Sequence, residues 1–401
     1  MSKKHKSRFL FDVVVIGGLG HVGLPLGLIF AKEGLKTCLT DIDSLKAGLV
    51  KKGIMPFIEY GAEPILKEVL RNGKLAVSLD LKSASKGKYI IIALGTPIDE
   101  YLNPKTRVFL EIFLKLKKYL RRDQVIIVRS TVYPHTCRQI LKILGGNANS
   151  WRVAYCPERI VQGYAVKELK ELPQIVSGMT LEAADEAAKL FGLISSKIIK
   201  TSIEEAELVK LFSNSWRYIQ FAVTNQFYMI ARDFGVDYNK VRQAMTEGYG
   251  RTATLPTAGF AAGPCLLKDT MQLVAFSSDN FVLGHAAMLV NEGLPNFLVN
   301  KLRQKHDLSK AKIGILGMTF KADIDDIRDS LSYKLGKILR FHGAKVYYSD
   351  EYAKDRTFVN KEKLLKLSDI IIIGVPHSAY KSLKITRGKE VIDLWGIVKK
   401  Q

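Results

Sequence analysis

Short apolar runs alternate with amphipathic segments along the first half of the chain. Five stretches rich in Val and Ile predict strands: "FDVVVIGG", "LKTCLTDID", "KYIIIALGTP", "DQVIIVRSTVYP" and "RVAYCPERI". The first has little polar alternation, which is typical of a parallel strand covered on both faces. Helical patterns such as "RVFLEIFLKLKKYL" lie between the strands. This alternation predicts a doubly wound parallel sheet.

The pattern changes after residue 201. The stretch "SIEEAELVKLFSNSWRYIQFAVTNQFYMIARDFG" has apolar residues at three- and four-residue spacing, which predicts one long helix. Because apolar residues lie on more than one side of it, we expect a homodimer formed through this helix. Strands and helices then alternate again in "AKIGILGMTF", "AKVYYSD", "SDIIIIGVP" and "KEVIDLW", which predicts a second, smaller α/β domain.

These patterns predict an α/β fold in which two Rossmann-like doubly wound parallel-sheet domains are joined by a central helical domain. We place the N-terminal domain at residues 1–201, the helical domain at 202–302 and the C-terminal domain at 303–401. The length of 401 residues fits two or three domains, at roughly 150 residues each.

Charge and cysteine content narrow the expected partners. The chain has 61 Lys and Arg against 39 Asp and Glu, a net charge of +22, but the basic residues are spread along it. A solvated Lys-rich surface is therefore favoured over a nucleic-acid or membrane surface. Four scattered cysteines without a C-x-x-C pair predict neither a disulfide framework nor a metal site. We expect a cytoplasmic protein.

A glycine fingerprint follows the first predicted strand. Gly18, Gly20 and Gly23 form G-x-G-x-x-G, which suits a tight turn, the approach of a pyrophosphate and close packing of a helix on a strand. Asp41 ends the next predicted strand, where an acid can bind a ribose 2′-hydroxyl and repel a 2′-phosphate. The combination predicts NAD as the cofactor.

Polar residues also follow two later strands. Ser130 and Thr131 end one of them, at the edge where open α/β sheets bind ligands. Taken alone, such a Ser-Thr pair is more commonly a helix cap or turn. Glu158 and Arg159 follow Pro157 at another strand end, and on the residues alone a surface ion pair is an equal interpretation.

Lys210, Asn214 and Arg217 lie three and four residues apart on the long helix and share one face among apolar neighbours. This polar stripe indicates a buried site or an interface. A solvated face is the alternative.

Cys265 lies in "AAGPCLLKDT", three and four residues before Lys268 and Asp269. A nearby Lys favours the reactive thiolate. A lone Cys is nonetheless more commonly a small buried hydrophobe, and this fragment alone leaves both interpretations open.

Seven motifs in order resemble the nucleotide-sugar 6-dehydrogenases, the superfamily of UDP-glucose and UDP-N-acetylhexosamine dehydrogenases. They are "GLGHVGLP", "GTP" (Gly95–Pro97), "STVYPHT", "CPERIVQG", "KLFSNSWR", "GPCLLKD" and "FKADIDDIRDS", and they span nearly the whole chain. The resemblance implies oxidation of a sugar C6 alcohol to a uronic acid with two NAD per turnover.

The resemblance also implies the catalytic roles. Cys265 would be the nucleophile, which forms a thiohemiacetal and then a thioester that water hydrolyses. Lys210 would be a general base or an electrostatic partner of the C6 oxygen, and Asn214 a donor to the oxyanion. Water activation would fall to Asp269, Glu158 and Thr131, without a decision on which is the base.

The remaining site residues follow from the same motifs. Those expected to contact the cofactor are Gly18, Gly20, His21, Val22, Gly23, Asp41, Lys46, Thr96, Thr131, Lys268 and Arg328. Those expected to hold the UDP-sugar are Glu158, Arg159, Ile160, Lys210, Asn214, Arg217, Arg251, Phe320 and Lys321.

Several positions depart from the family pattern. His135 replaces a glycine, and if that position needs a positive φ the local loop geometry is in question. Ala261 and Ala262 replace expected glycines before the cysteine, and Leu267 stands where Pro is common. The backbone that receives the sugar could therefore be narrower or stiffer.

The sequence favours one substrate class among several. "CPERIVQG" resembles the N-acetylhexosamine branch, so we expect UDP-N-acetylmannosamine or UDP-N-acetylglucosamine. UDP-glucose is the second candidate and GDP-mannose the third. A simple β-hydroxyacid dehydrogenase is disfavoured by the second α/β domain and by "GPCLLKD". A non-catalytic nucleotide-sugar sensor is disfavoured by the intact Cys265, Lys210, Asn214 and Asp269.

Overall fold

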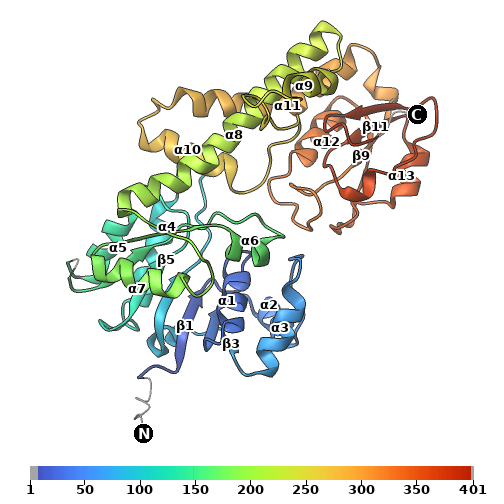
Figure 1. The fold of residues 1–401 in the computed structure, drawn as a ribbon. Helices are drawn as coiled ribbons and strands as arrows, with labels where there is room; N and C mark the ends of the chain where they lie inside the picture. The colour runs from blue at the N-terminus through green and yellow to red at the C-terminus, as the bar shows by residue number, and fades with distance from the viewer. Residues whose placement is uncertain (1–7, 148, 399–401) are drawn as a thin grey trace. The chain divides into compact units, whose positions relative to one another are not determined.

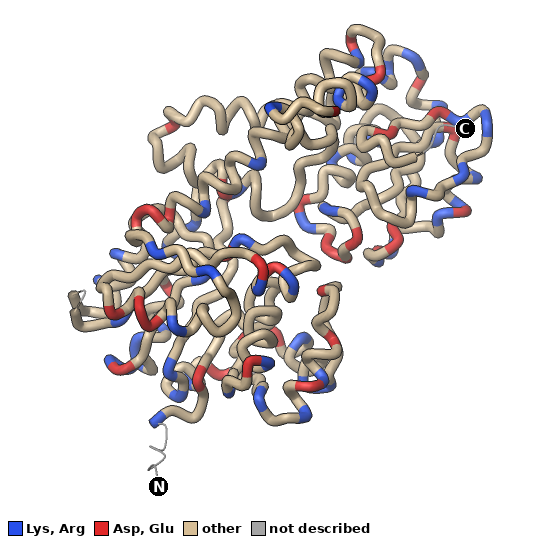
Figure 2. The backbone as a smooth tube through the Cα atoms, viewed as in Figure 1, with Lys and Arg blue, Asp and Glu red and all other residues tan. Residues whose placement is uncertain are grey.

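The computed structural model describes residues 8–147 and 149–398. The chain divides into two compact units, Met1–Phe212 and Ser213–Gln401, each with its own sheet (Figure 1). Lys and Arg are distributed over both units, with acidic residues interspersed (Figure 2). None of the helices among the described residues combines the length and apolarity needed to cross a membrane.

The first unit is built on an eight-stranded sheet of order β3-β2-β1-β4-β5-β6-β7-β8. Its strands are β1 Phe11–Ile16, β2 Thr37–Thr40, β3 Leu75–Ser78, β4 Gly87–Ile92, β5 Val125–Val128, β6 Arg152–Tyr155, β7 Gln174–Gly178 and β8 Ile198–Lys200. The five predicted strands are confirmed as β1, β2, β4, β5 and β6. The sheet is not wholly parallel, because β7 runs antiparallel to β6.

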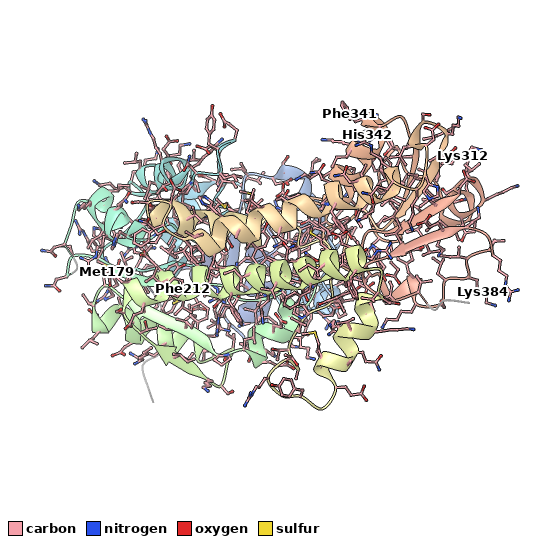
Figure 3. The ribbon with its side chains drawn as sticks, turned by 90° about the horizontal axis from the view of Figure 1, so that it is seen from above. Met179, Phe212, Lys312, Phe341, His342 and Lys384 are labelled. Carbon is pink, nitrogen blue, oxygen red and sulfur yellow. The ribbon has the colours of Figure 1, made fainter. Side chains whose placement is uncertain are left out.

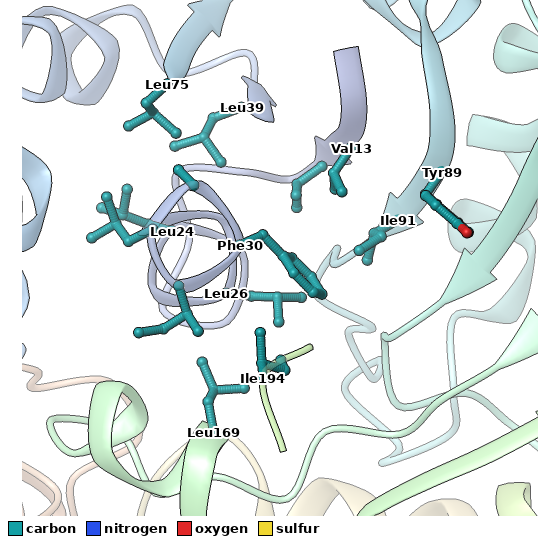
Figure 4. Packing of buried hydrophobic residues seen from close by; sticks show 14 of the residues in the cluster. Val13, Leu24, Leu26, Phe30, Leu39, Leu75, Tyr89, Ile91, Leu169 and Ile194 are labelled. Atoms are coloured by element: carbon teal, nitrogen blue, oxygen red, sulfur yellow. The ribbon is translucent and has the colours of Figure 1, made fainter. Parts of the chain in front are cut away.

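Helices cover both faces of this sheet. They are α1 Gly23–Lys32, α2 Ser44–Lys51, α3 Ala62–Arg71, α4 Thr106–Leu116, α5 Thr136–Leu144, α6 Ala165–Glu171 and α7 Leu181–Phe191, with a 3-10 helix η1 at Leu81–Lys86. One core lies between α1, α3, α6, α7 and the sheet, and Figure 4 shows Phe30 of α1 packed among Leu26, Ile91 and Ile194. A second core on the opposite face takes apolar residues from α4 and α5.

The predicted long helix is confirmed as α8, Ile203–Phe234, and it continues from the first unit into the second. It is followed by α9 Tyr238–Thr246, α10 Leu266–Phe276 and α11 Val282–Arg303. Within the second unit α8 and α11 run side by side (Figure 3), joined by a hydrogen bond of 2.9 Å between the buried Asn225 and Asn291.

The second sheet is fully parallel and has the order β10-β9-β11-β12. Its elements are η2 Leu308–Lys310, β9 Lys312–Leu316, α12 Leu331–Phe341, β10 Lys345–Ser349, α13 Lys361–Leu367, β11 Ile370–Ile373, η3 Ser378–Tyr380 and β12 Glu390–Asp393. Its core draws on α11 and α12 on one face, with a smaller cluster on the other. The predicted second α/β region is confirmed.

The parallel strands place the predicted polar residues at one edge of the first sheet. The glycine loop follows β1, Asp41 follows β2, Thr131 follows β5 and Glu158 follows β6. Because the carboxyl ends of parallel strands share an edge, the fold gathers these groups where α/β sheets bind ligands.

We predict that Gly23→Ala destabilises the first unit. A Cβ on Gly23 would lie 2.3 Å from the backbone oxygen of Gly17, so helix α1 would have to move away from the turn. Overpacking of this kind costs about 1–3 kcal/mol. The matched control is Gly48→Ala in α2, where a Cβ meets nothing within 4 Å and helix propensity gains about 0.5–1 kcal/mol. Urea unfolding of both variants measures the difference, and equal stability of the two would contradict the packing argument.

Candidate active site

The three glycines of the fingerprint differ in how closely other atoms surround them in the loop between β1 and α1. A Cβ on Gly18 would lie 2.8 Å from the Cα of Leu39, and Gly23 is enclosed as described above. Gly20 differs, because a Cβ there would meet no atom nearer than 3.6 Å. The loop is therefore tight where strand and helix meet and open at its second glycine. This geometry fits the pyrophosphate of a dinucleotide.

Asp41 at the end of β2 ties this loop to the sheet. Its Oδ2 accepts the backbone N–H of Leu19 at 3.0 Å, and its Oδ1 accepts those of Ile42 and Asp43 at 2.8 and 3.2 Å. A carboxylate here fits a ribose diol and repels a 2′-phosphate, as NAD requires. Lys46 turns toward Asp43 instead, with 3.6 Å between its Nζ and the carboxylate.

The other predicted cofactor residues of this unit lie in loops near the same edge. The His21 ring packs on Phe57 with ring centroids 3.9 Å apart, and Val22 is the N-cap of α1. Thr96 lies in the loop after β4, and Thr131 lies in the loop after β5, where it is half-buried.

Glu158 forms a buried ion pair, and its partner is Arg129. Arg159, its neighbour in the sequence, instead donates to the backbone oxygen of Pro173. The Nε and Nη2 of Arg129 lie 2.9 and 2.5 Å from Oε2 of Glu158. Oε1 of Glu158 accepts the backbone N–H groups of Arg159 and Ile160 at 2.7 and 3.0 Å. The surface ion-pair interpretation is therefore wrong, and the carboxylate is fixed inside the protein.

Glu207 of α8 caps the helix that follows the Thr131 loop. Its carboxylate accepts the backbone N–H of His135 at 2.6 Å and that of Cys137 at 3.0 Å. His135 has φ of 67°, so this position does require the left-handed backbone that a glycine adopts most easily. Burial raises the pKa of Glu207, against the lowering effect of these bonds. The bonds hold a strained residue in place.

The predicted polar stripe on α8 is only partly buried. Lys210 and Asn214 are 9% and 6% exposed, which excludes the solvated-face interpretation for both. Arg217, one turn further on, is exposed to solvent.

Cys265 is the exposed member of the four free cysteines. It is the N-cap of α10, where the helix dipole favours a thiolate. The preceding Gly263 has φ of 99°, and its Cα is covered by the Phe320 ring, which a Cβ would approach to 2.4 Å. The pKa of Arg328 is raised, chiefly by its hydrogen bond to Asp326, with a smaller electrostatic contribution from Cys265.

The other cysteines are poor nucleophiles. Burial raises the pKa of Cys38 and that of Cys137, and it raises the pKa of Cys156 to about 12. Their thiolates are therefore scarce near neutral pH.

Asp269 connects α10 to α8. Its Oδ2 accepts from Nδ2 of Asn214 at 2.6 Å, and its Oδ1 pairs with Nζ of Lys268. The Asp269 residue is 1% exposed, so both partners are held against a buried anion. Since Lys268 and Asp269 lie in the first turn of α10, they come close to Cys265 at its N-cap.

The loop after β9 carries Phe320, Lys321 and Arg328, and the remaining predicted residue, Arg251, lies between α9 and α10. Asp350, at the end of β10, accepts the backbone N–H groups of Met318 and Thr319 at 2.6 and 3.1 Å, just before Phe320 and Lys321. Arg328 pairs with Asp326 at 2.5 Å, and Arg251 lies exposed with its guanidinium carbon 5.9 Å from the Tyr249 ring. No cluster of His, Cys, Asp and Glu suited to a metal ion occurs in residues 8–147 or 149–398.

The structure thus groups the predicted residues within each unit. In the first, Asp41 accepts a backbone N–H of the glycine loop. Glu158 links the loops after β5 and β6 through its ion pair with Arg129. In the second, Lys268 and Asp269 follow Cys265 in the first turn of α10, and Asn214 is hydrogen-bonded to Asp269. Sequence reasoning missed Arg129 and Glu207. Glu207 could have been found, because it lies three residues before Lys210 on the same helical face.

The first sheet and its glycine loop define an NAD-binding dehydrogenase of the doubly wound class. Family models agree along the chain, matching an NAD binding domain at residues 12–193, a central domain at 204–292 and a UDP binding domain at 314–400. The chain belongs to the UDP-glucose/GDP-mannose dehydrogenase family. It is an NAD-dependent nucleotide-sugar dehydrogenase.

Individual relatives span nearly the full length. The UDP-N-acetyl-D-mannosamine dehydrogenase of Pyrococcus horikoshii is 30% identical over 410 residues, covering 96% of each chain. A solved structure named as UDP-D-ManNAc dehydrogenase from the same organism has a TM-score of 0.89 at 29% identity, covering 97% of this chain and 96% of that one. A UDP-glucose dehydrogenase of Pyrobaculum islandicum also has a TM-score of 0.89, at 24% identity over 98% and 96%, and shares the fold.

We predict that Asp269→Asn lowers stability by about 2 kcal/mol, because hydrogen bonds to a charged group contribute about 1.5–3 kcal/mol and Lys268 would lose its anionic partner. Asp279→Asn is the matched control. Asp279 is an exposed acid after α10 with φ of 63°, a backbone conformation that Asn accepts well. The Asp279→Asn variant should lose no more than about 0.5 kcal/mol of folding stability. Urea unfolding measures both, and similar losses would show that the Asn214–Asp269–Lys268 contacts contribute nothing special.

Proposed function

We propose that this enzyme oxidises the C6 alcohol of UDP-N-acetylmannosamine, or of UDP-N-acetylglucosamine, to the uronic acid. The observation that carries the proposal is the exposed Cys265 at the N-terminus of α10, next to the buried Asn214–Asp269 pair. The choice of sugar is supported by "CPERIVQG" and by the relative that is 30% identical. UDP-glucose is the alternative, since an equally similar fold carries that name, and GDP-mannose is the third candidate.

The chemistry proceeds in two oxidations and a hydrolysis. When bound at the glycine loop, NAD would supply the hydride acceptor for each oxidation. In the first, the C6 alcohol loses a hydride and a proton and becomes an aldehyde. The Cys265 Sγ then adds to the aldehyde carbon, and the thiohemiacetal loses a second hydride and proton to become a thioester. Water adds to the thioester carbonyl, the C–S bond breaks, and the carboxylate product and the thiol are released.

The chain's own residues take three kinds of role. Lys210 neutralises the C6 oxygen or accepts its proton, and Asn214 donates to the oxyanion of the tetrahedral species. Asp269, Thr131 and Glu158 are assigned to the water that hydrolyses the thioester. The diphosphate and uridine are assigned to Arg159, Ile160, Arg217, Arg251, Phe320 and Lys321, and the cofactor to Gly18, Gly20, His21, Val22, Gly23, Asp41, Lys46, Thr96, Thr131, Lys268 and Arg328.

We also propose that the chain forms three domains and that the protein works in a reducing compartment. Family matches break between residues 193 and 204 and between 292 and 314, near the proposed boundaries at 201/202 and 302/303. A cytoplasmic location fits the four free cysteines, one of which must stay a thiol.

We also propose a homodimer formed through α8. Six large apolar residues are exposed on one side of this helix at three-, four- and seven-residue spacing: Phe212, Trp216, Val223, Phe227, Ile230 and Phe234. Trp216 and Phe234 are 61% and 82% exposed, which is costly for a lone helix in water. A second copy of the same helix would cover this stripe.

We expect two NADH per molecule of sugar consumed, because two hydrides leave C6. A panel of UDP-N-acetylmannosamine, UDP-N-acetylglucosamine, UDP-glucose and GDP-mannose measures the ratio and ranks the substrates. Cys265→Ser should abolish uronate formation and leave the Kd for NAD unchanged. One NADH per sugar would exclude the four-electron reaction, unchanged turnover of the variant would remove Cys265 from it, and no turnover with any sugar would favour a sensor.

We expect Phe227→Lys with Ile230→Lys to convert a dimer to a monomer in sedimentation equilibrium, because two buried charges would face their copies across the interface. Phe341→Lys is the control, since Phe341 is a similarly exposed aromatic (85%) at the end of α12 (Figure 3). An unchanged mass in the double variant, or a monomeric native protein, would refute the α8 interface.

A further inference from the structure

The loop that leads to Cys265 is held in its middle by Asn225 of α8. Asn225 is 0% exposed, and its side-chain amide meets both backbone groups of Gly259. Its Oδ1 accepts the Gly259 N–H at 2.9 Å, and its Nδ2 donates to the Gly259 carbonyl oxygen at 3.0 Å. Gly259 is buried outside any helix or strand, so these bonds satisfy backbone groups that would otherwise lack a partner. The amide thus pairs with the loop as one residue of a strand pairs with another.

A second buried amide orients Asn225. Its Nδ2 also donates to Oδ1 of Asn291 in α11 at 2.9 Å, and Nδ2 of Asn291 donates to the backbone oxygen of Tyr218 at 3.0 Å. Both N–H groups and the oxygen of the Asn225 amide are therefore used, and a flipped amide would place a donor against the Gly259 N–H. These bonds fix the middle of the loop relative to α8 and α11.

The two ends of the same loop are fixed as well. At its start, the backbone oxygen of Pro256 accepts from Oγ1 of Thr224 at 2.9 Å and from Nε of Arg242 at 3.0 Å. At its end, the N–H of Gly263 donates to the backbone oxygen of Asp329 at 3.3 Å. Residues 256–264 are therefore held at three points before the chain reaches the cysteine.

Side chains of the loop add to these bonds. A Cβ on Gly259 would lie 2.3 Å from the Trp395 ring, so only glycine fits there, and Gly263 is covered by a ring as described above. Ala261 is 4% exposed and packs among apolar residues of α8 and α11, and Ala262 is half-buried against the core of the second sheet. Both alanines stand where the family pattern has glycine. Their methyl groups anchor the loop and restrict its backbone more than glycine would.

We propose that Asn225 is a positioning residue that presets residues 256–264, with Ala261 and Ala262 as anchors, so that Cys265 lies at the N-cap of α10 before any sugar nucleotide binds. This inference rests on the proposed function, in which Cys265 is the nucleophile, and deepens it. The helix dipole favours the thiolate only while Cys265 stays at that N-cap. A loop that loosens lets the thiol leave this position, and misplacement of a reacting group lowers kcat.

Two measurements on the ligand-free, full-length protein follow the loop and the thiol without turnover. Hydrogen–deuterium exchange of peptides covering residues 256–265 reports opening of the loop. The pH dependence of alkylation by iodoacetamide reports the thiolate of Cys265, because the other three cysteines are buried. In wild type we expect a protected loop and an alkylation midpoint below the ordinary thiol pKa of about 8.5. Exchange that becomes slow only after UDP is added would overturn the proposal.

The decisive variant is Asn225→Ala, and its matched control is Asn291→Ala. Both remove a buried amide from the same pair, and each should lower the folding equilibrium constant roughly 10- to 100-fold. Only the first also releases the backbone of Gly259. We expect Asn225→Ala to speed exchange of the loop, to raise the alkylation midpoint and to lower kcat at least about tenfold. Asn291→Ala should leave the midpoint and kcat unchanged. Equal effects of the two variants would show a role in stability alone and overturn the proposal.

Milder variants keep the test open if Asn225→Ala does not fold. Asn225→Ser takes its place, because one hydroxyl cannot satisfy both backbone groups of Gly259. Ala261→Gly with Ala262→Gly removes only the anchoring methyl groups, and it should speed exchange of the loop and raise the alkylation midpoint. Unchanged values in these variants would overturn the proposal.

The outcome is separable from that of the proposed function. If wild type oxidises none of the sugars, the proposed function fails, whereas exchange and alkylation still decide whether Asn225 presets the loop. If the sugars are oxidised but the loop is unprotected without UDP, the proposed function stands and this inference fails.

Discussion

Carboxylates that accept backbone N–H groups hold the loops at the carboxyl edges of both sheets. Asp41, Glu158 and Glu207 do so in the first unit and Asp350 in the second, each taking at least two backbone donors. Such irregular backbone lacks partners in a sheet or helix, and its N–H groups must be satisfied in another way. Bonds to an ionised acceptor are roughly twice as strong as neutral ones. The loops that would meet ligands are therefore rigid before any ligand binds.

Both sheets have a carboxylate that accepts backbone N–H groups of a loop, but the two loops differ. In the first, α1 begins at Gly23, so the helix N-terminus and the open Gly20 both lie beside the acid at the end of β2. In the second, Gly317 has φ of 91°, but α12 begins only at Leu331. The long intervening loop is held by Asp350 and presents side chains in place of a helix N-terminus. A dinucleotide fits the first arrangement, and the family match to a UDP binding domain fits the second.

The regular fold was predictable, because its signals are local. Unbroken runs such as the Ile370–Ile373 strand β11, and the apolar spacing of α8, follow from the sequence. The strands β3, β7 and β8 were missed, and β8 is only Ile198–Lys200 with two of its three residues exposed. Arg129 was missed for another reason. Its partners Glu158 and Gln174 are 29 and 45 residues away, and only the folded sheet brings them together.

The exposure of Cys265 excludes one of the two interpretations that the residues left open, that of a buried hydrophobe. A buried hydrophobe and a nucleophile differ in solvent exposure and in the charge around the thiol, and neither can be deduced from "GPCLLKD". The fold exposes this thiol and places it at the start of α10, whereas the other three cysteines are buried and have raised pKa values. Asp269 lies four residues after Cys265, in the first turn of the same helix. Its carboxylate is paired with Lys268 and accepts a hydrogen bond from Asn214. Because the Lys268 ammonium offsets the charge of Asp269, the buried acid and the exposed cysteine can lie within one helix turn of each other.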